Sequence, residues 1–205
     1  MDADLKSLQE VRDAMKRAVA AQRVFARADQ AAVDRVCAAV AAAGEAAAAD
    51  LARLAVEETG FGCVEGKTLK NRFATRDVWA SIRDLKTVGY IRRDPARGVD
   101  EVAVPMGVVA AVIPVTNPTS TALFKILIAL KGRNGVVLSP HPRAVRCITA
   151  STEAAAKAAS AAGAPEGLVQ CLGTPTLEST EALKREIKSA MTYPVVSLCL
   201  VILIT

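Results

Sequence analysis

The stretch that decides the fold is "GVVAAVIPVTNPTSTALFKILIALKGRNGVVLS", residues 107–139. It opens with a continuous apolar run, which is typical of a strand that is covered on both faces. A helical pattern follows, with Pro118 suited to its first position and Gly132 to its end. "GVVLS" then reads as a second apolar strand. The stretch therefore predicts one β-α-β unit of a parallel sheet.

The same pattern repeats downstream. After the turn "PHPRA", residues 144–163 predict an Ala-rich helix, "GLVQCL" a third strand and "TLESTEALKREI" a further helix. The apolar run 194–205 predicts a fourth strand, since it is too short for the roughly 20 residues that span a bilayer. Residues 107–205 thus predict a β-α-β-α-β-α-β core, an α/β fold with a doubly wound, mainly parallel, Rossmann-like sheet.

Residues 1–106 predict a helical segment that carries an extended hairpin. Apolar residues at helical spacing indicate an antiparallel helical hairpin over residues 3–60, interrupted at Gly44 and ended at Gly60. A third helix is expected over residues 66–85. "TVGYIRR" and "VDEVAVP" flank the turn-forming "DPARG" and predict two extended segments.

Composition bounds the class of protein. Of the 205 residues, 52% are hydrophobic but only 3% aromatic, so the core must be built from aliphatic side chains. The net charge of +5 is modest and its basic residues alternate with acidic ones, which gives little support for nucleic acid binding. The polar N-terminus lacks a signal-peptide core and the cysteines lack CxxC spacing. We therefore expect a cytoplasmic protein without a membrane segment.

Two turns are the candidate ligand sites, because open parallel sheets bind ligands beyond the carboxyl ends of their strands. Residues 114–119 and 139–143 both place small hydroxyls and polar side chains at the start of a helix. Such turns suit phosphate or another anion. The chain has no GxGxxG sequence, so a standard dinucleotide motif is not predicted.

Asn117 and His141 each have two interpretations. Asn117 can cap the following helix by accepting a hydrogen bond from a backbone N–H, or its carboxamide can donate to an oxyanion formed from a carbonyl substrate. His141, between two prolines, can be structural or exposed, or it can contact a nucleotide. No second histidine exists to complete a zinc site, so no metal centre is predicted.

The cysteines offer no clear nucleophile. Four are expected in the core because they lie in helical or strand patterns: Cys37, Cys147, Cys171 and Cys199. Cys63 is expected to be accessible, but no neighbouring base or cation pair is evident. The basic run Lys67, Lys70, Arg72 and Arg76 is expected to form one solvated helix face.

Several motifs, in order, resemble one family. Residues 104–144, with the upstream "EETGFGCVEGKTLKNRFATRD" and "DLKTVG", resemble the N-terminal nucleotide-binding region of the CoA-acylating aldehyde dehydrogenases. That family includes the aldehyde dehydrogenase half of bifunctional alcohol/aldehyde enzymes and sulfoacetaldehyde dehydrogenases. The resemblance covers roughly residues 5–178.

The resemblance implies a reaction of a short aldehyde with NAD or NADP and coenzyme A. A cysteine thiolate attacks the aldehyde, hydride passes to the nicotinamide, and coenzyme A resolves the thioacyl-enzyme. On this pattern Asn117 matches the asparagine that holds the oxyanion, and Thr116, Ser139, His141 and Pro142 fall in loops around the shared NAD and CoA pocket. A homo-oligomer is also implied for the full-length family protein.

The family's nucleophilic cysteine lies downstream of Thr205, in a separate domain. We therefore expect this chain to be a truncated family member that is inactive alone. The alternative is a non-catalytic module that binds a nucleotide or another chain.

Overall fold

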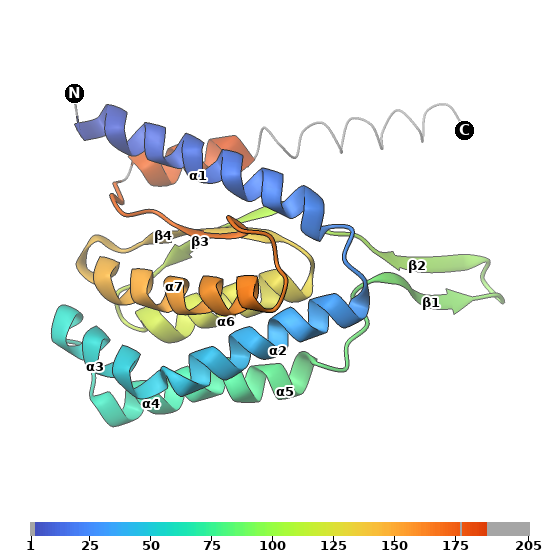
Figure 1. The fold of residues 1–205 in the computed structure, drawn as a ribbon, viewed down its shortest axis with the longest axis horizontal. Helices are drawn as coiled ribbons and strands as arrows, with labels where there is room; N and C mark the ends of the chain where they lie inside the picture. The colour runs from blue at the N-terminus through green and yellow to red at the C-terminus, as the bar shows by residue number, and fades with distance from the viewer. Residues whose placement is uncertain (1–2, 177, 188–205) are drawn as a thin grey trace.

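The computed structural model of the chain describes residues 3–176 and 178–187 (Figure 1). The N-terminal helices are α1 (Ala3–Phe25), α2 (Gln30–Ala46), α3 (Ala48–Thr59), α4 (Val64–Arg72) and α5 (Val78–Ile82). The strands and the helices between them are β1 (Gly89–Asp94), β2 (Val99–Ala103), β3 (Val108–Ile113), α6 (Pro118–Lys131), β4 (Gly135–Pro140), α7 (Val145–Ala161) and β5 (Val169–Cys171). The predicted strand 194–205 and Cys199 lie outside the described residues.

The central sheet is parallel, with the strand order β3-β4-β5. Val108 pairs with Gly135 and Val136 with Val169, so each strand lies beside the next one in the sequence. Pro118 occupies the start of α6 and Gly132 its C-cap, as the turn residues predict. The parallel β-α-β units predicted for this part of the chain are therefore confirmed.

Both faces of the sheet are covered by helices (Figure 1). Within β4, Val136 and Leu138 pack into the cluster that includes α6 and α7, whereas Val137 packs against α1. This alternation follows from the two-residue period of a strand, and it explains why β4 is apolar throughout. Residues 178–187 are helical and lie with α1 on the Val137 side. The doubly wound arrangement is confirmed.

Residues 3–60 form three helices, α1, α2 and α3, instead of the predicted antiparallel hairpin interrupted at Gly44. α1 lies on one face of the sheet, whereas α2 packs over α6 and α7 on the other (Figure 1). The helical periodicity identifies the buried side of each helix but not the layer that this side meets. Here Val11 and Ala18 of α1 contact the β4 side chain Val137, not α2. The two helices are therefore separated by the sheet.

Gly44 lies inside α2, and the helix breaks at Ala47 instead. A Cβ atom at Gly44 would lie 2.6 Å from Thr75 Cγ2 and 3.1 Å from a Leu123 methyl group. Real Cβ atoms do not come this close to a neighbour, so the glycine allows close packing with a π-helical segment at Phe73–Asp77. This segment joins α4 to α5, so that the helix predicted over residues 66–85 is continuous from Val64 to Ile82.

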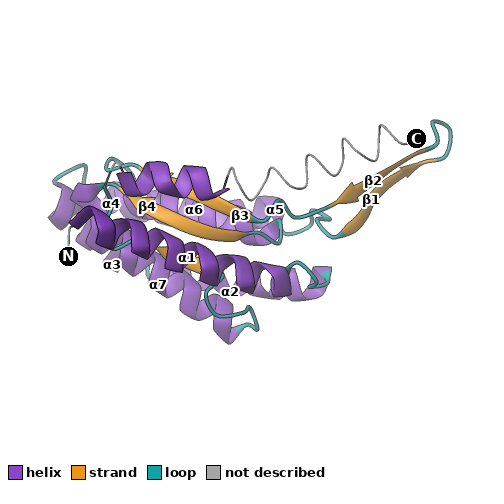
Figure 2. Cartoon of the chain, turned by 90° about the horizontal axis from the view of Figure 1, so that it is seen from above, coloured by secondary structure: helices purple, strands orange, loops and turns teal. Residues whose placement is uncertain are grey.

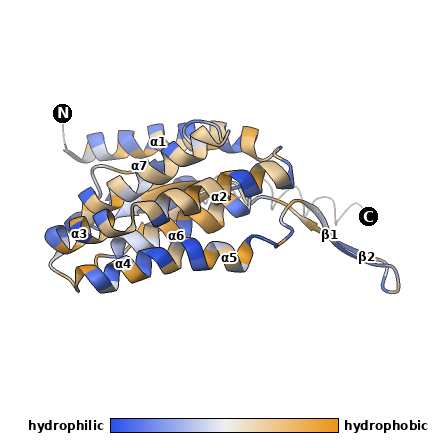
Figure 3. Ribbon diagram, turned by 60° about the horizontal axis from the view of Figure 1, so that its bottom comes forward, coloured by the Kyte–Doolittle hydropathy of each residue, from blue (hydrophilic) through white to orange (hydrophobic). Residues whose placement is uncertain are grey.

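The predicted extended pair is an antiparallel hairpin, β1 and β2, which projects from the helical body (Figure 2). Its outer part is largely hydrophilic (Figure 3). It nevertheless exposes four large apolar or aromatic side chains: Tyr90, Ile91, Val99 and Val102. Among the described residues, no helix combines the length and the apolar character needed to cross a membrane.

Candidate functional site

The turn between β3 and α6 holds Asn117 at the N-cap position of the helix. Its side chain makes no capping hydrogen bond, so the capping interpretation is wrong. Instead, the Oδ1 atom of Asn117 accepts a hydrogen bond of 2.9 Å from Lys70 Nζ on α4. The carboxamide is therefore held by a side chain from the N-terminal helices and not by the helix that it begins.

A second lysine, one helical turn earlier, holds the same loop. Lys67 Nζ donates to the backbone oxygen of Thr116 at 2.9 Å, and Lys67 is buried. Burial, and then the nearby Lys70 charge, lower the pKa of Lys67 from its usual value. The predicted solvated face is thus wrong for Lys67, while Lys70, Arg72 and Arg76 are exposed as expected.

The contact with Lys70 determines which end of the Asn117 carboxamide is available. An ammonium group has three donors and no acceptor, so it can hold only the oxygen. The Nδ2 atom of Asn117 then points elsewhere, and no acceptor in the described part of the chain takes its hydrogens. Asn117 therefore presents an N–H donor that no residue described by the structure uses.

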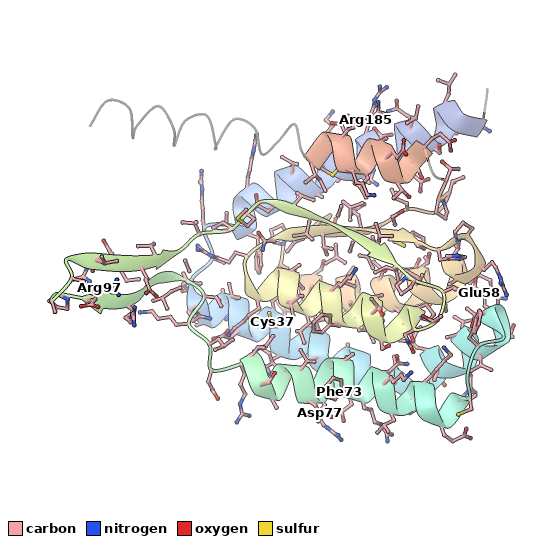
Figure 4. All side chains as sticks on the ribbon, turned by 180° about the vertical axis from the view of Figure 1, so that it is seen from behind. Cys37, Glu58, Phe73, Asp77, Arg97 and Arg185 are labelled. Carbon is pink, nitrogen blue, oxygen red and sulfur yellow. The ribbon has the colours of Figure 1, made fainter. Side chains whose placement is uncertain are left out.

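Asn117 lies at a pocket of about 310 Å³. The pocket is lined by Lys70, Phe73, Ala74, Asn117, Ser120, Thr121 and Phe124. Its polar side comes from Lys70, Asn117 and the first turn of α6, and its apolar side from the π-helical segment and Phe124. Figure 4 labels Phe73 and Asp77 on this continuous helix. The pocket suits a small molecule with one carbonyl group and a short apolar chain.

A buried polar network fixes α6 relative to α4. Thr119 Oγ1 donates to Asn71 Oδ1 at 2.8 Å, and Asn71 Nδ2 donates to the backbone oxygen of Ala48 at 2.9 Å. Both side chains are almost fully buried, and each of the two bonds satisfies a group that would otherwise be costly to bury. The start of α6, and with it Asn117, is therefore rigidly placed.

The turn between β4 and α7 carries the other predicted ligand contacts. His141 is half-buried, and its Nδ1 atom accepts a hydrogen bond of 3.1 Å from the backbone N–H of Arg143, while Pro142 is exposed. Ser139 is only 2% exposed, and its hydroxyl is 2.8 Å from that of Thr180. His141 thus has a structural role in its turn, and Ser139 has no exposed hydroxyl for a ligand.

A carboxylate already occupies the N-terminus of α7. Glu58, from α3, accepts hydrogen bonds from the backbone N–H groups of Arg146 and Cys147, at 2.8 and 2.7 Å. Arg143 also donates to the backbone oxygen of Thr59 at 3.4 Å. Figure 4 shows Glu58 at the end of the molecule opposite the hairpin tip. The anion site expected at this helix start is therefore filled by the protein itself.

None of the described cysteines has a hydrogen bond to the Asn117 amide. Cys37 and Cys147 are buried, and burial raises the pKa of each thiol to about 12; for Cys147, Glu58 adds to the effect. Burial also raises the pKa of Cys171. A thiol that stays protonated is a poor nucleophile. Cys63 is exposed just before α4, and within the described residues no thiol has a hydrogen bond to Asn117.

The sequence singled out Asn117 as a candidate but did not reveal the residues that hold it. Lys67, Lys70 and Asn71 belong to one turn of α4, and their spacing placed the two lysines on a single helix face. That spacing was the available signal, but it does not reveal which residues the helix face contacts.

Among the residues that the structure describes, no three His, Cys, Asp or Glu side chains gather in a way that could hold a metal ion.

Comparisons with known proteins agree on one relationship. The model of the "Aldehyde dehydrogenase family" matches residues 2–192. The crystal structure of an acetylating aldehyde dehydrogenase from Geobacillus thermoglucosidasius is 50% identical, with a TM-score of 0.87 over 89% of this chain and 40% of that one. An aldehyde-alcohol dehydrogenase of Clostridium acetobutylicum is 41% identical over 88% of this chain. An acylating sulfoacetaldehyde dehydrogenase of Bilophila wadsworthia is 36% identical over 86%.

The chain spans 21% of the Clostridium relative and 39% of the Bilophila relative. Two other similar structures, each 30% identical with a TM-score of 0.70, carry ligands. One is an engineered glycolyl-CoA reductase with bound NADP⁺, and the other a propionaldehyde dehydrogenase of Rhodopseudomonas palustris with bound CoA and an acylated cysteine.

Proposed function

We propose that this chain, which belongs to the aldehyde dehydrogenase family, provides the substrate- and nucleotide-binding part of a CoA-acylating aldehyde dehydrogenase. The reaction converts a short aldehyde, such as acetaldehyde or sulfoacetaldehyde, to its acyl-CoA. The observation that carries the proposal is the free N–H donor of Asn117 at the edge of a pocket with an apolar wall. Relatives named for acylating activity support the same reaction.

Asn117 has the chemistry that the reaction needs. When a thiolate adds to an aldehyde carbon, the carbonyl oxygen gains negative charge, and a fixed N–H donor stabilises that charge. We place the aldehyde oxygen at Asn117 Nδ2 and its alkyl group against Phe73, Ala74 and Phe124. The donor is already oriented before the substrate arrives, so little reorganisation is needed.

We propose NAD or NADP as the cofactor and coenzyme A as the second substrate. A bound nicotinamide would supply a hydride acceptor. Thr116, His141 and Pro142 are the proposed contacts because they are exposed or half-buried at the strand ends, whereas Ser139 is buried. These residues suit a sugar or base. A phosphate does not fit at the start of α7, since Glu58 fills it.

We further propose that the 205-residue chain alone does not complete the reaction, because burial raises the pKa of the Cys37, Cys147 and Cys171 thiols and no described cysteine has a hydrogen bond to Asn117. The alternative function is a module that binds NAD or CoA without catalysis. A reducing cytoplasm is the proposed location, which fits the four free cysteines among the described residues.

The test combines turnover with binding. The purified chain is mixed with propanal, NAD⁺ and CoA, and NADH is followed by absorbance; we expect none, and NADH formation would show that a chain cysteine serves as the nucleophile. Thermal unfolding is then measured with NAD⁺, NADP⁺ or CoA, since a ligand that binds the folded state raises its stability. We expect a ligand to raise the midpoint of thermal unfolding. His141→Ala should make this rise smaller, whereas Glu153→Ala, an exposed change on α7, should leave it unchanged. No shift with any of the three would contradict the nucleotide-binding part of the proposal.

The projecting hairpin supports a further proposal, that the chain forms homo-oligomers. Tyr90 and Val102 pair across the two strands and are both exposed, which places two apolar side chains together on an otherwise hydrophilic element, and such surfaces are often protein contacts. Light scattering of the purified chain is expected to give a mass above 21.4 kDa. Val102→Lys should lower that mass, and an unchanged monomeric mass in both proteins would contradict the proposal.

A further inference from the structure

Lys70 and Asn117 form a side-chain pair that no part of the proposed reaction explains by itself. We infer that Lys70 is a positioning residue, which orients and polarises the Asn117 carboxamide so that its N–H groups serve the substrate carbonyl. The inference rests on the proposed function. Its basis is the 2.9 Å hydrogen bond from Lys70 Nζ to Asn117 Oδ1, together with the place of both residues in the wall of one pocket.

The first part of the inference is orientation. The oxygen and nitrogen of a carboxamide exchange places when the group rotates by half a turn, and an asparagine without a partner can present either. An oxyanion site needs the nitrogen. Because an ammonium group only donates, Lys70 excludes the orientation that would aim the Asn117 oxygen at a negatively charged oxygen. It also draws the carboxamide away from the backbone of α6, where an ordinary cap would hold it.

The second part is polarisation. A hydrogen bond from a cation to an amide oxygen is stronger than a neutral one, and it makes the amide N–H groups better donors. The Lys70 charge therefore reaches the developing oxyanion through one planar group. The lysine does not itself touch the reacting atoms in this arrangement, which is why it positions rather than catalyses.

Lys67 binds a different group from Lys70, and this difference guides the choice of variants that test the role of Lys70. Lys67 is buried and holds the backbone of Thr116, so its loss would disturb the loop itself. Lys70 is exposed, and within the described residues its ammonium group has a hydrogen bond only to the Asn117 side chain. Lys70→Met should therefore leave the fold intact. Lys70→Arg keeps the cation, and Arg72→Met removes a cation from the same helix without facing the turn.

The experiment observes the Asn117 side-chain amide directly by NMR in the ¹⁵N-labelled full chain, with Asn117→Ala to assign its signals. Propionamide is the probe, because it has a carbonyl and a short alkyl group but forms no imine with lysines. In the wild type and in Lys70→Arg, we expect propionamide to shift the Asn117 signals. In Lys70→Met, the signals of the free protein should move, and the propionamide Kd should rise about threefold to tenfold, as for loss of one hydrogen bond. Arg72→Met should match the wild type.

The outcomes separate the inference from the proposed function. If Lys70→Met leaves both the Asn117 signals and the propionamide Kd unchanged, the positioning role is wrong, although the aldehyde site stands. If propionamide shifts no Asn117 signal in the wild type, the aldehyde site is wrong. A changed amide spectrum in Lys70→Met would then still support the orientation of Asn117 by Lys70. Backbone signals distant from the turn report whether each variant is folded.

Discussion

The turns that follow β3 and β4 occupy equivalent places in the sheet, yet the N-terminal helices treat them in opposite ways. The first turn is held by two cations, which bind the Thr116 carbonyl and the Asn117 side-chain oxygen. The second is held by one anion, Glu58, which binds two N–H groups of α7. The first turn is left with an unused donor, and the second with its helix amides filled. A helix start after a parallel strand can therefore bind a ligand only where the protein itself does not already occupy its hydrogen-bonding groups.

Both sets of partners come from residues that precede the sheet. α4 supplies the lysines and α3 supplies the glutamate. Helix α2 also shares one hydrophobic cluster with the sheet, which joins Val33 and Val36 to Val136 and Leu138 of β4. The helical segment thus determines the chemistry at the strand ends as well as covering the sheet.

The largest expected effect is the loss of the network behind the first turn. Asn71→Ala removes both hydrogen bonds of a buried amide and leaves the Thr119 hydroxyl and the Ala48 oxygen unpaired. We expect the free energy of unfolding in urea to fall by about 3 kcal/mol. The exposed neighbour Arg72→Ala should change it by less than about 0.5 kcal/mol. Adding Thr119→Val to Asn71→Ala should cost less than the sum of the single changes. Equal effects of Asn71→Ala and Arg72→Ala would refute the network.

Removing the anion from the second turn should have the next largest effect. Glu58→Ala exposes the N–H groups of Arg146 and Cys147, and we expect a loss of about 2 kcal/mol in urea unfolding. Phosphate should restore part of this stability, because the variant has an open helix start. Glu57→Ala is the matched control, since that carboxylate is exposed and, among the described residues, pairs only with Arg146. If phosphate stabilises the wild type and Glu58→Ala equally, Glu58 does not fill the helix start of the second turn.

A smaller effect is expected from pH, through a thiol next to the second turn. The pKa of Cys147 is raised to about 12, whereas an unfolded cysteine ionises near 9.0. Between these values the unfolded chain releases a proton that the folded chain keeps, so stability should fall as pH rises above about 9. Cys147→Ala should flatten this fall between about pH 8 and 11, while Ser151→Ala, which removes no titrating group, should not. The same slope in both variants would contradict the raised pKa.

The smallest effect on stability is expected at Cys63, beside the helix that serves the first turn. This thiol is exposed, while Cys37 and Cys147 are buried. N-ethylmaleimide should modify Cys63 rapidly and the two buried thiols only after unfolding, with a change in unfolding free energy below about 0.5 kcal/mol. Peptide mapping by mass spectrometry identifies the modified residue, and Cys63→Ala should lose the fast adduct. Rapid modification of Cys37 in the folded protein would contradict its burial.

The sheet was predictable because its signals are local. Apolar runs marked β3 and β4, and Pro118 and Gly132 marked the ends of α6. The side of the sheet on which α1 lies was not predictable, since its apolar face would suit either layer. The partners of Asn117 and of α7 were missed for the same reason. A lysine or glutamate on a helix surface reveals its charge, but the group that it meets belongs to an element far away in the sequence.

Gly44 of α2 influences the shape of the pocket beside Asn117, although it does not line that pocket. Its missing side chain sets the spacing between α2 and Thr75, at the centre of the π-helical segment. Ala74, the residue before Thr75, forms part of the pocket wall beside Asn117. A single methyl group added at Gly44 would push against that segment from behind. The width of the pocket beside Asn117 therefore depends on Gly44, which belongs to a helix that does not line the pocket.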